Sequence, residues 1–213
     1  MYDIFLMIIM AFLIYIFSSI PFGLLIGKRF KQKDLRLLGS QNIGASNAVR
    51  VLGFKYGLLI FILDFLKGFL PIIIVSFLDI NGNYYRGFIR KHIIILGLAA
   101  ILGHMFSVFN KFKGGKAIAT SVGLITGINP VIGVLGVLFF VILVLWKGYA
   151  SLASLISTLL VNILLFNDFF LCCNNIDITN YDKILIFFIT IIVFLKHYNN
   201  IINLIKGAEN KFK

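Results

Sequence analysis

Hydrophobic residues in this chain form seven runs, and short polar segments rich in Lys, Arg, Asn and Gly separate them. Most runs approach the about 20 apolar residues that a helix needs to cross the hydrocarbon core of a bilayer. The pattern predicts an all-α integral membrane bundle of about seven transmembrane helices, forming a single domain over residues 1–213. The predicted spans are residues 4–27, 56–78, 92–109, 116–128, 131–146, 149–166 and 181–195.

The composition agrees with a membrane protein and argues against a soluble domain. Hydrophobic residues make up 60% of the chain and the mean hydropathy is +1.01, whereas soluble domains are closer to half apolar. The first run is not predicted to be a cleaved signal, because no basic segment precedes it and no small-residue cleavage site follows it. The adjacent Cys172 and Cys173 lack metal-binding spacing and are assigned no role.

The formal net charge of +12 comes from basic residues that gather between alternate spans. A nucleic-acid partner is one explanation of such a charge, but cytoplasmic loops of membrane proteins also collect Lys and Arg. Seven spans with the amino terminus outside put fifteen basic residues on the cytoplasmic side and three in the opposite loops. We therefore predict a cytoplasmic carboxy terminus and no nucleic-acid partner. The cytoplasmic set is Lys28, Arg29, Lys31, Lys33, Arg36, Arg50, Lys55, Lys111, Lys113, Lys116, Lys147, Lys196, Lys206, Lys211 and Lys213, and the opposite loops hold Arg86, Arg90 and Lys91.

The segment from Gly39 to Arg50 is unusually polar for its surroundings, with two serines, two asparagines, a glutamine and an arginine. Such groups are costly to place against lipid without hydrogen-bond partners. Hydroxyls, amides, a guanidinium and glycine backbone suit an anion with many oxygens, such as a phosphate. A solvated loop built from good turn formers is the alternative for this segment taken alone.

A second polar segment runs from Lys111 to Lys116 and contains the pair Gly114-Gly115. Adjacent glycines let backbone approach an anion closely, and the lysines supply charge to neutralise it. The helix predicted to follow would point its N-terminal dipole at the same place. The spacing of a Walker A motif is absent, so nucleotide hydrolysis is not indicated.

The predicted orientation places these polar segments and the carboxy-terminal tail on the same, cytoplasmic side. Together they form a candidate phosphate-binding site of cations and neutral donors. Neither a metal-ligand cluster nor a G-x-S-x-G elbow is present in the sequence, so no metal, cofactor or serine nucleophile is expected. The candidate residues are Ser40, Asn42, Ser46, Asn47, Arg50, Lys116, Ser151, His197 and Asn200.

Four polar residues need a separate interpretation. His197 can act as a general base toward a hydroxyl or simply hydrogen-bond a phosphate, and both roles stay open. His104, flanked by glycine and apolar residues, is interpreted as structural. Asp64 and Lys67, three positions apart in an apolar span, are interpreted as a buried pair that braces the bundle, in preference to a catalytic pair.

In this order and combination, the motifs resemble those of the bacterial membrane glycerol-3-phosphate acyltransferases that use acyl phosphate as donor. The resemblance covers nearly the whole chain, and the set is specific although each motif alone is weak. The motifs are Ser19-Ile20-Pro21-Phe22-Gly23, Gly39 to Arg50, Asp64-x-x-Lys67-Gly68, Gly103-His104-x-Phe106, Phe112-Lys113-Gly114-Gly115-Lys116, Ser151-Leu152-Ala153-Ser154 and His197-x-x-Asn200-Ile201.

The resemblance implies a seven-helix enzyme of the bacterial cytoplasmic membrane, with its active site facing the cytoplasm. It would transfer an acyl group from acyl phosphate to the 1-hydroxyl of glycerol 3-phosphate, giving lysophosphatidic acid and phosphate, without an obligatory protein partner or cofactor. This is the first step of phospholipid synthesis. By motif position, Ser40, Asn42, Ser46 and Asn47 would hold the donor phosphate. Arg50, Lys116, Ser151, His197 and Asn200 would bind glycerol 3-phosphate, and Ser40, Arg50, Lys116 and His197 are the predicted catalytic set.

The sequence departs from the family pattern at four positions. Gln41 and Ala117 stand where glycine is usual, Ser46 where threonine is usual, and Ser107 where proline is usual. Ser46 keeps the hydroxyl, whereas Gln41 and Ala117 restrict the backbone of the two polar segments.

Two other functions fit parts of the sequence. A permease for a phosphorylated solute would use similar cations, but it usually shows repeated halves with paired broken helices, and the Gly39–Arg50 segment has no second copy. A scaffold that binds anionic lipid head groups would explain the lysines, but not the Ser- and Asn-rich segment or His197.

Overall fold

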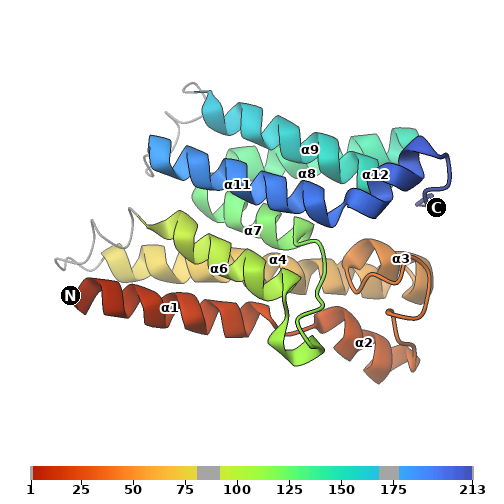
Figure 1. Cartoon of the computed structure of the whole chain (residues 1–213), viewed down its shortest axis with the longest axis horizontal. Coiled ribbons are helices and arrows are strands. Elements are labelled where there is room, and N and C mark those ends of the chain that lie inside the picture. Colours follow the sequence, from red (N-terminus) through yellow and green to blue (C-terminus); the bar gives the residue numbers. More distant parts are fainter. Residues whose placement is uncertain (1, 81–91, 168–177, 213) are drawn as a thin grey trace.

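A computed structural model describes residues 2–80, 92–167 and 178–212, and every regular element in these ranges is a helix (Figure 1). Long apolar helices run side by side along the molecule, and short helices gather at the end that also carries the carboxy terminus. The chain order is α1 (Tyr2–Ser18), α2 (Phe22–Lys31), α3 (Ala45–Leu52), α4 (Phe54–Ile80), α6 (Ile93–Met105), η1 (Val108–Asn110), α7 (Ile118–Ile128), α8 (Pro130–Lys147), α9 (Ala150–Phe166), α11 (Asn180–Lys196) and α12 (Tyr198–Ile205).

Four of these segments are long and apolar enough to cross a membrane: Ile4–Lys31, Phe54–Phe77, Ile93–Asn110 and Pro130–Lys147. A fifth is formed if α11 and α12, bent by 57° at a short break, are counted as one span. The helices α7 and α9 are apolar but shorter. The predicted all-helical membrane protein is therefore confirmed. Each of the seven predicted apolar segments contains a helix, but the first, predicted as residues 4–27, is divided between α1, which ends at Ser18, and α2.

Two predictions about local structure were wrong. The segment from Gly39 to Arg50 is not a loop throughout, because α3 begins at Ala45. The residues after His197 are not simply a tail, because they form α12. The first span is broken at Ser19–Pro21, where proline removes a backbone donor. Cys172 and Cys173, which the sequence assigns no role, lie outside the described residues.

The helices form two groups that meet along α7. The first contains α1, α4 and α6, and the second contains α8, α9 and α11, as Figure 1 shows. A buried core of side chains from α4, α6, α7, α8, α9 and α11 joins the groups. Glycines permit the closest approach, because a Cβ at Gly68 of α4 would stand 2.0 Å from the Thr120 carbonyl oxygen of α7.

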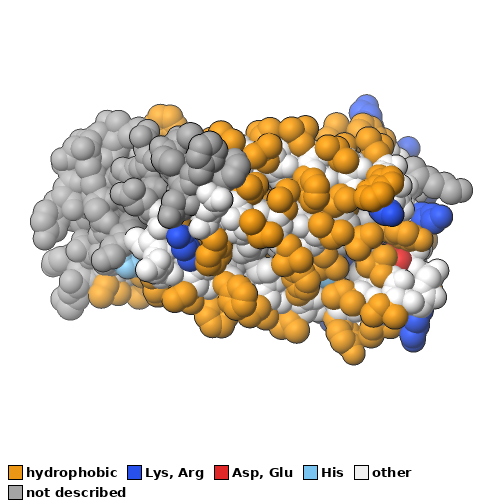
Figure 2. All heavy atoms as spheres, turned by 90° about the horizontal axis from the view of Figure 1, so that it is seen from above, with side chains coloured by type: hydrophobic (Ala, Val, Ile, Leu, Met, Phe, Trp, Pro, Cys, Tyr) orange, Lys and Arg blue, Asp and Glu red, His pale blue; other side chains and the backbone are white. Residues whose placement is uncertain are grey.

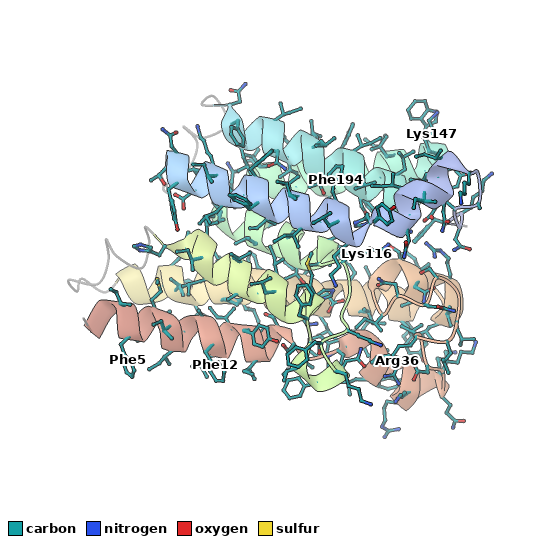
Figure 3. All side chains as sticks on the ribbon, viewed as in Figure 1. Phe5, Phe12, Arg36, Lys116, Lys147 and Phe194 are labelled. Atoms are coloured by element: carbon teal, nitrogen blue, oxygen red, sulfur yellow. The ribbon has the colours of Figure 1, made fainter. Side chains whose placement is uncertain are left out.

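The outer surface suits a lipid environment. Hydrophobic side chains cover the middle of the face in Figure 2, and the blue Lys and Arg side chains gather mostly at one end. On α1, Phe5 and Phe12 point away from the bundle in Figure 3 and are 64% and 61% exposed. Exposure of large apolar residues on this scale is typical of a protein surrounded by lipid.

Candidate active site

A cavity of about 710 Å³ opens among the short helices and extends between the long ones. Its mouth is polar, and its deeper walls are apolar side chains of α4, α7, α8, α9 and α11. All nine candidate residues from the sequence line this one cavity. The structure thus brings together residues from four separate parts of the chain: Ser40, Asn42, Ser46, Asn47, Arg50, Lys116, Ser151, His197 and Asn200.

The first polar segment is shaped by the side chain of Asn47, which is buried. Its Oδ1 accepts a hydrogen bond from Ser40 N at 2.8 Å, and its Nδ2 donates to the carbonyls of Leu38 at 3.0 Å and Asn42 at 2.9 Å. Asn42 Oδ1 in turn accepts from Gly44 N at 2.8 Å. The amide of Asn47 is therefore already used in folding the loop that carries Ser40 and Asn42.

Among the helix N-termini that border the cavity are those of α3, α7 and α9. None of the three has a side-chain cap, because Gly44, Ala117 and Tyr149 occupy the N-cap positions. Uncapped first turns leave backbone N–H groups available, and the helix dipoles add positive potential at the same place. This arrangement favours an anion at the cavity mouth.

The second polar segment places Lys116 at the mouth of the cavity. Figure 3 labels this residue between the two groups of helices. Gly114 N and Gly115 N donate to the carbonyls of Met105 and His104 at 3.1 and 3.2 Å. A side chain at Gly115 would meet His104 Nε2 at 2.2 Å, so only glycine fits this contact. Lys116 Nζ donates to Asn200 Oδ1 of α12.

Glu209 is a site residue that the sequence analysis missed. The segment after α12 folds back, with Phe212 N donating to the Gly148 carbonyl, and this buries Glu209. Glu209 Oε1 accepts hydrogen bonds from Ser151 Oγ at 2.8 Å and from Asn200 Nδ2 at 2.7 Å. The available signal was a single acidic residue in a basic tail. Only the fold shows that this tail returns to the cavity.

Charges at the mouth are held away from water. Burial lowers the pKa of Lys116 to about 8, against the opposing effect of the Glu209 carboxylate, while nearby Arg50 lowers it further. Burial also lowers the pKa of Arg50, with Glu209 again acting in the opposite direction. Within the described residues, the Nε and Nη1 atoms of Arg50 are buried without a hydrogen-bond partner. Such a guanidinium is well placed to bind an oxyanion.

His197 sits at the junction of α11 and α12 and is 2% exposed. Its Nδ1 lies 2.8 Å from the Val193 carbonyl oxygen. A carbonyl can only accept, so Nδ1 carries the proton and Nε2 is left as a hydrogen-bond acceptor in the neutral ring. That tautomer can accept a hydrogen bond from a substrate hydroxyl.

The pairing predicted for Asp64 and Lys67 is confirmed, with 2.7 Å between Oδ1 and Nζ. His104 joins this pair, since its Nδ1 lies 3.5 Å from each of the two atoms. All three side chains are buried. Because His104 also contacts the Gly115 backbone, the cluster links α4 and α6 to the segment that carries Lys116.

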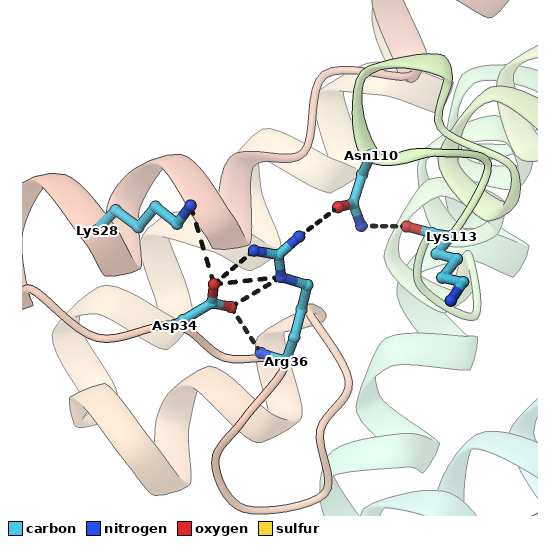
Figure 4. A network of polar contacts seen from close by, with 5 residues as sticks. All are labelled: Lys28, Asp34, Arg36, Asn110 and Lys113. Atoms are coloured by element: carbon cyan, nitrogen blue, oxygen red, sulfur yellow. Dashed lines mark hydrogen bonds and ion pairs between the residues drawn. The ribbon is translucent and has the colours of Figure 1, made fainter.

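A surface network ties the residues just before the first polar segment to the second polar segment (Figure 4). Arg36 Nη2 lies 2.6 Å from Asp34 Oδ2, and Arg36 Nη1 donates to Asn110 Oδ1 at 2.9 Å. Asn110 Nδ2 donates in turn to the Lys113 carbonyl. Hydrogen bonding to Arg36 lowers the pKa of Asp34 to about 2, so this carboxylate stays charged at neutral pH.

The described ranges contain no group of three or more His, Cys, Asp and Glu residues arranged to hold a metal ion. The chemistry at the mouth is instead that of two cations, amides, hydroxyls and open helix N-termini. Such a set can bind phosphate groups and stabilise negative charge that develops during a group transfer.

Comparisons with known proteins identify the family of this chain. The family model described as glycerol-3-phosphate acyltransferase matches residues 8–207. A glycerol-3-phosphate acyltransferase of Phytoplasma australiense is 53% identical over 94% of this chain and 92% of its own length. The enzyme of the same name from Staphylococcus aureus (strain Newman) is 37% identical over 97% of this chain and 98% of its own length.

Solved structures show the same fold. The crystal structure of PlsY, an integral membrane glycerol 3-phosphate acyltransferase in its glycerol 3-phosphate form, matches with a TM-score of 0.83 and 35% identity. This match covers 97% of the present chain and 95% of the other. The lysophosphatidic acid form of that protein matches with a TM-score of 0.79. The chain therefore belongs to the glycerol-3-phosphate acyltransferase family of integral membrane enzymes.

Proposed function

We propose that this acyltransferase moves a fatty acyl group from acyl phosphate to the 1-hydroxyl of sn-glycerol 3-phosphate. The products are 1-acylglycerol 3-phosphate (lysophosphatidic acid) and inorganic phosphate. One observation carries the proposal: a single cavity joins a polar mouth that holds Arg50 and Lys116 to apolar walls inside the bundle. Acyl phosphate has a phosphate head and a lipid tail, and glycerol 3-phosphate is a small water-soluble anion. Such a cavity suits both.

The acceptor is assigned to the cationic side of the mouth. Arg50, with unpaired guanidinium nitrogens, and Lys116 take the phosphate of glycerol 3-phosphate. Asn200 and Ser151, which share Glu209 as a hydrogen-bond partner, orient the glycerol part. His197 Nε2 accepts a hydrogen bond from a glycerol hydroxyl.

The donor phosphate is assigned to the first polar segment and the N-terminus of α3. Ser40, Asn42 and Ser46 line the cavity next to the open backbone N–H groups of that helix. Asn47 contributes by holding the segment in shape, since its amide bonds the backbone on both sides. The acyl tail then extends along the apolar walls.

The reaction breaks one carbon–oxygen bond and forms another. The 1-oxygen of glycerol 3-phosphate bonds to the acyl carbonyl carbon, and the bond from that carbon to the bridging phosphate oxygen breaks. The hydroxyl proton passes to the departing phosphate, so His197 positions the hydroxyl in this scheme. Most of the acceleration comes from holding both substrates in register and from cations that offset developing charge.

The same proposal extends to the membrane. The enzyme would span the bacterial cytoplasmic membrane seven times, with the amino terminus outside and the mouth of the cavity in the cytoplasm. The excess of Lys and Arg on the predicted cytoplasmic side supports this orientation. Glycerol 3-phosphate would then arrive from the cytoplasm and acyl phosphate from the bilayer, with no protein partner or cofactor taking part.

The direct test supplies purified protein with palmitoyl phosphate and radiolabelled glycerol 3-phosphate. We expect label in lysophosphatidic acid together with release of phosphate, and no turnover when palmitoyl-coenzyme A replaces the donor. Absence of turnover in folded protein would reject the reaction and call for a transport assay.

The Lys116→Ala variant tests the site within the same assay. We expect a loss of about 100-fold or more in kcat/KM, because a buried charge-assisted contact to phosphate disappears. Lys147→Ala, which removes an exposed lysine stacked on Trp146, is the control and should keep full activity. Full activity in Lys116→Ala would contradict the assignment of Lys116 to the acceptor site.

A further inference from the structure

A stripe of polar residues runs along α9 into the otherwise apolar deep end of the cavity. On α9, Ser151, Ser154, Thr158 and Asn162 follow one another at helical spacing and all line the cavity. The helical rise from Ser151 to Asn162 is about 16 Å. At that depth Asn162 Nδ2 donates to Thr190 Oγ1 of α11 at 2.8 Å.

Most polar groups along this stripe are satisfied within the helices. Ser154 Oγ and Thr158 Oγ1 donate to carbonyls four positions earlier, each at 2.8 Å. Thr190 Oγ1 donates to the Ile186 carbonyl at 3.0 Å. Such groups leave a predominantly apolar wall for a chain to pass.

Two oxygens in the deeper half of this stripe are different. Among the described residues, Ser157 Oγ and Asn162 Oδ1 are buried without a hydrogen-bond partner. Ser157 is 7% exposed, and both residues line the cavity. A polar, roomy end of a cavity holds water that satisfies such groups. An apolar chain reaching this depth would displace that water and leave the oxygens unpaired, which is unfavourable.

We propose that Ser157 and Asn162 form a polar floor that limits the length of the acyl chain the enzyme accepts. This inference rests on the proposed function, since it assigns the apolar arm of the cavity to the acyl tail. Chains that end above the floor bind fully, whereas longer chains must bend or displace the water.

The test compares dodecanoyl, hexadecanoyl and octadecanoyl phosphate as donors with labelled glycerol 3-phosphate. In Asn162→Leu, kcat/KM for the octadecanoyl donor relative to the dodecanoyl donor should rise about tenfold, the effect of one unpaired buried polar group. Ser157→Ala should shift the ratio in the same direction. An unchanged ratio in both folded variants would overturn the proposal.

The control is Thr126→Val. Thr126 Oγ1 also donates to its own helix, at 2.7 Å to the Val122 carbonyl, but Thr126 does not line the cavity. The Thr126→Val variant should leave the dependence of kcat/KM on acyl-chain length unchanged. If Asn162 only joined α9 to α11, Asn162→Leu would lower the melting temperature without altering the profile, and this result would also overturn the proposal.

A binding measurement separates this inference from the proposed reaction. Dodecanoyl and octadecanoyl lysophosphatidic acids are added to wild-type protein and Asn162→Leu, and the rise in melting temperature is recorded. We expect the octadecanoyl form to gain more than the dodecanoyl form in the variant. Absence of turnover would reject the acyl-phosphate reaction, while this thermal shift would still decide the role of the floor.

Discussion

The charge on Lys116 depends on its neighbours as much as on its own chemistry. Burial lowers the pKa of this ammonium from 10.5 to about 8, and the Glu209 carboxylate opposes that fall. Folding thus disfavours the protonated form, so between about pH 8 and 10.5 the unfolded chain binds more protons. In that window the Lys116 contribution to stability rises with pH, whereas its capacity to hold a phosphate declines.

We therefore expect kcat/KM for glycerol 3-phosphate to fall above about pH 8, by about tenfold per pH unit at most. Lys116→Arg should remove this alkaline decline, because a guanidinium stays charged. Glu209→Gln should move the decline to lower pH, because it removes the carboxylate that keeps the ammonium protonated. The measurement is the pH–rate profile of wild type, Lys116→Arg and Glu209→Gln. Identical profiles would contradict the assignment of Lys116 as a phosphate ligand.

Gln41 carries backbone strain that glycine would relieve. Its φ of 58° lies in the left-handed region, where a residue with a Cβ loses about 1 kcal/mol or more. We expect Gln41→Gly to raise the free energy of unfolding by about 0.5–1 kcal/mol, after allowing for the greater freedom of glycine in the unfolded chain.

Thermal unfolding in detergent measures this change. Lys55→Gly, placed near the start of α4 where the backbone is helical, is the matched control and should be destabilised instead. A lower melting temperature for Gln41→Gly would contradict this prediction. It would show that the Gln41 side chain stabilises the fold by more than the strain in its backbone destabilises it.

At residue scale the sequence identified what lines the cavity but not what each side chain does there. Residue type pointed to phosphate binding for Asn47, yet its amide is used to fold the loop, because only tertiary structure shows where a donor is directed. Glu209 was missed for a similar reason. Its partners Ser151 and Asn200 lie on other elements, and no local pattern links them to the tail.

Among the elements, α3 depends on the loop before it. Asn47 belongs to the helix but bonds the loop backbone at Ser40, Leu38 and Asn42, so helix and loop form one unit. The N-terminus of α3 keeps its place at the cavity mouth only while that unit is intact.

Asn47→Asp should disrupt this unit although it hardly changes shape. The carboxylate can still accept from Ser40 N, but it faces carbonyl oxygens that the amide nitrogen had bonded. We expect a loss of about 3 kcal/mol or more of stability and of most activity. Asn42→Asp is the control for stability, because Asn42 Oδ1 accepts from Gly44 N and a carboxylate preserves that bond. The melting temperature should fall in Asn47→Asp and stay near the wild-type value in Asn42→Asp. Turnover is compared only between Asn47→Asp and wild type, because a charge at Asn42 would also repel the donor phosphate.

Element by element, hydrophobic runs predicted the long helices well, since length and apolarity determine them. The short helices α3 and α12 were not predicted, because their polar composition resembles that of a loop. Both are strongly amphipathic, with apolar residues on one side only, and this periodicity was the signal available for α3 in Ala48 and Leu52, which are buried.

At the scale of the whole molecule, the predicted orientation in the membrane can be tested by labelling cysteines. Cys172 and Cys173 belong to the segment predicted to lie outside, and they are the chain's only cysteines. A membrane-impermeant thiol reagent should label them in intact cells expressing the protein. Leu37→Cys, at a position 76% exposed near the cavity end, in a chain whose native cysteines are replaced by serine, should react only after permeabilisation. Labelling of Leu37→Cys in intact cells, with Cys172 and Cys173 labelled only after permeabilisation, would show the opposite orientation.

The cavity connects a watery mouth with lipid-like walls, and this makes the rate depend on two kinds of concentration. In the proposed reaction the rate depends on the volume concentration of the acceptor in the cytoplasm. For the donor, the rate depends on its mole fraction within the bilayer. Adding inert lipid or detergent at fixed total donor should therefore slow turnover, although no bulk concentration changes. The growth of a membrane would then lower the surface density of the donor on which that growth depends.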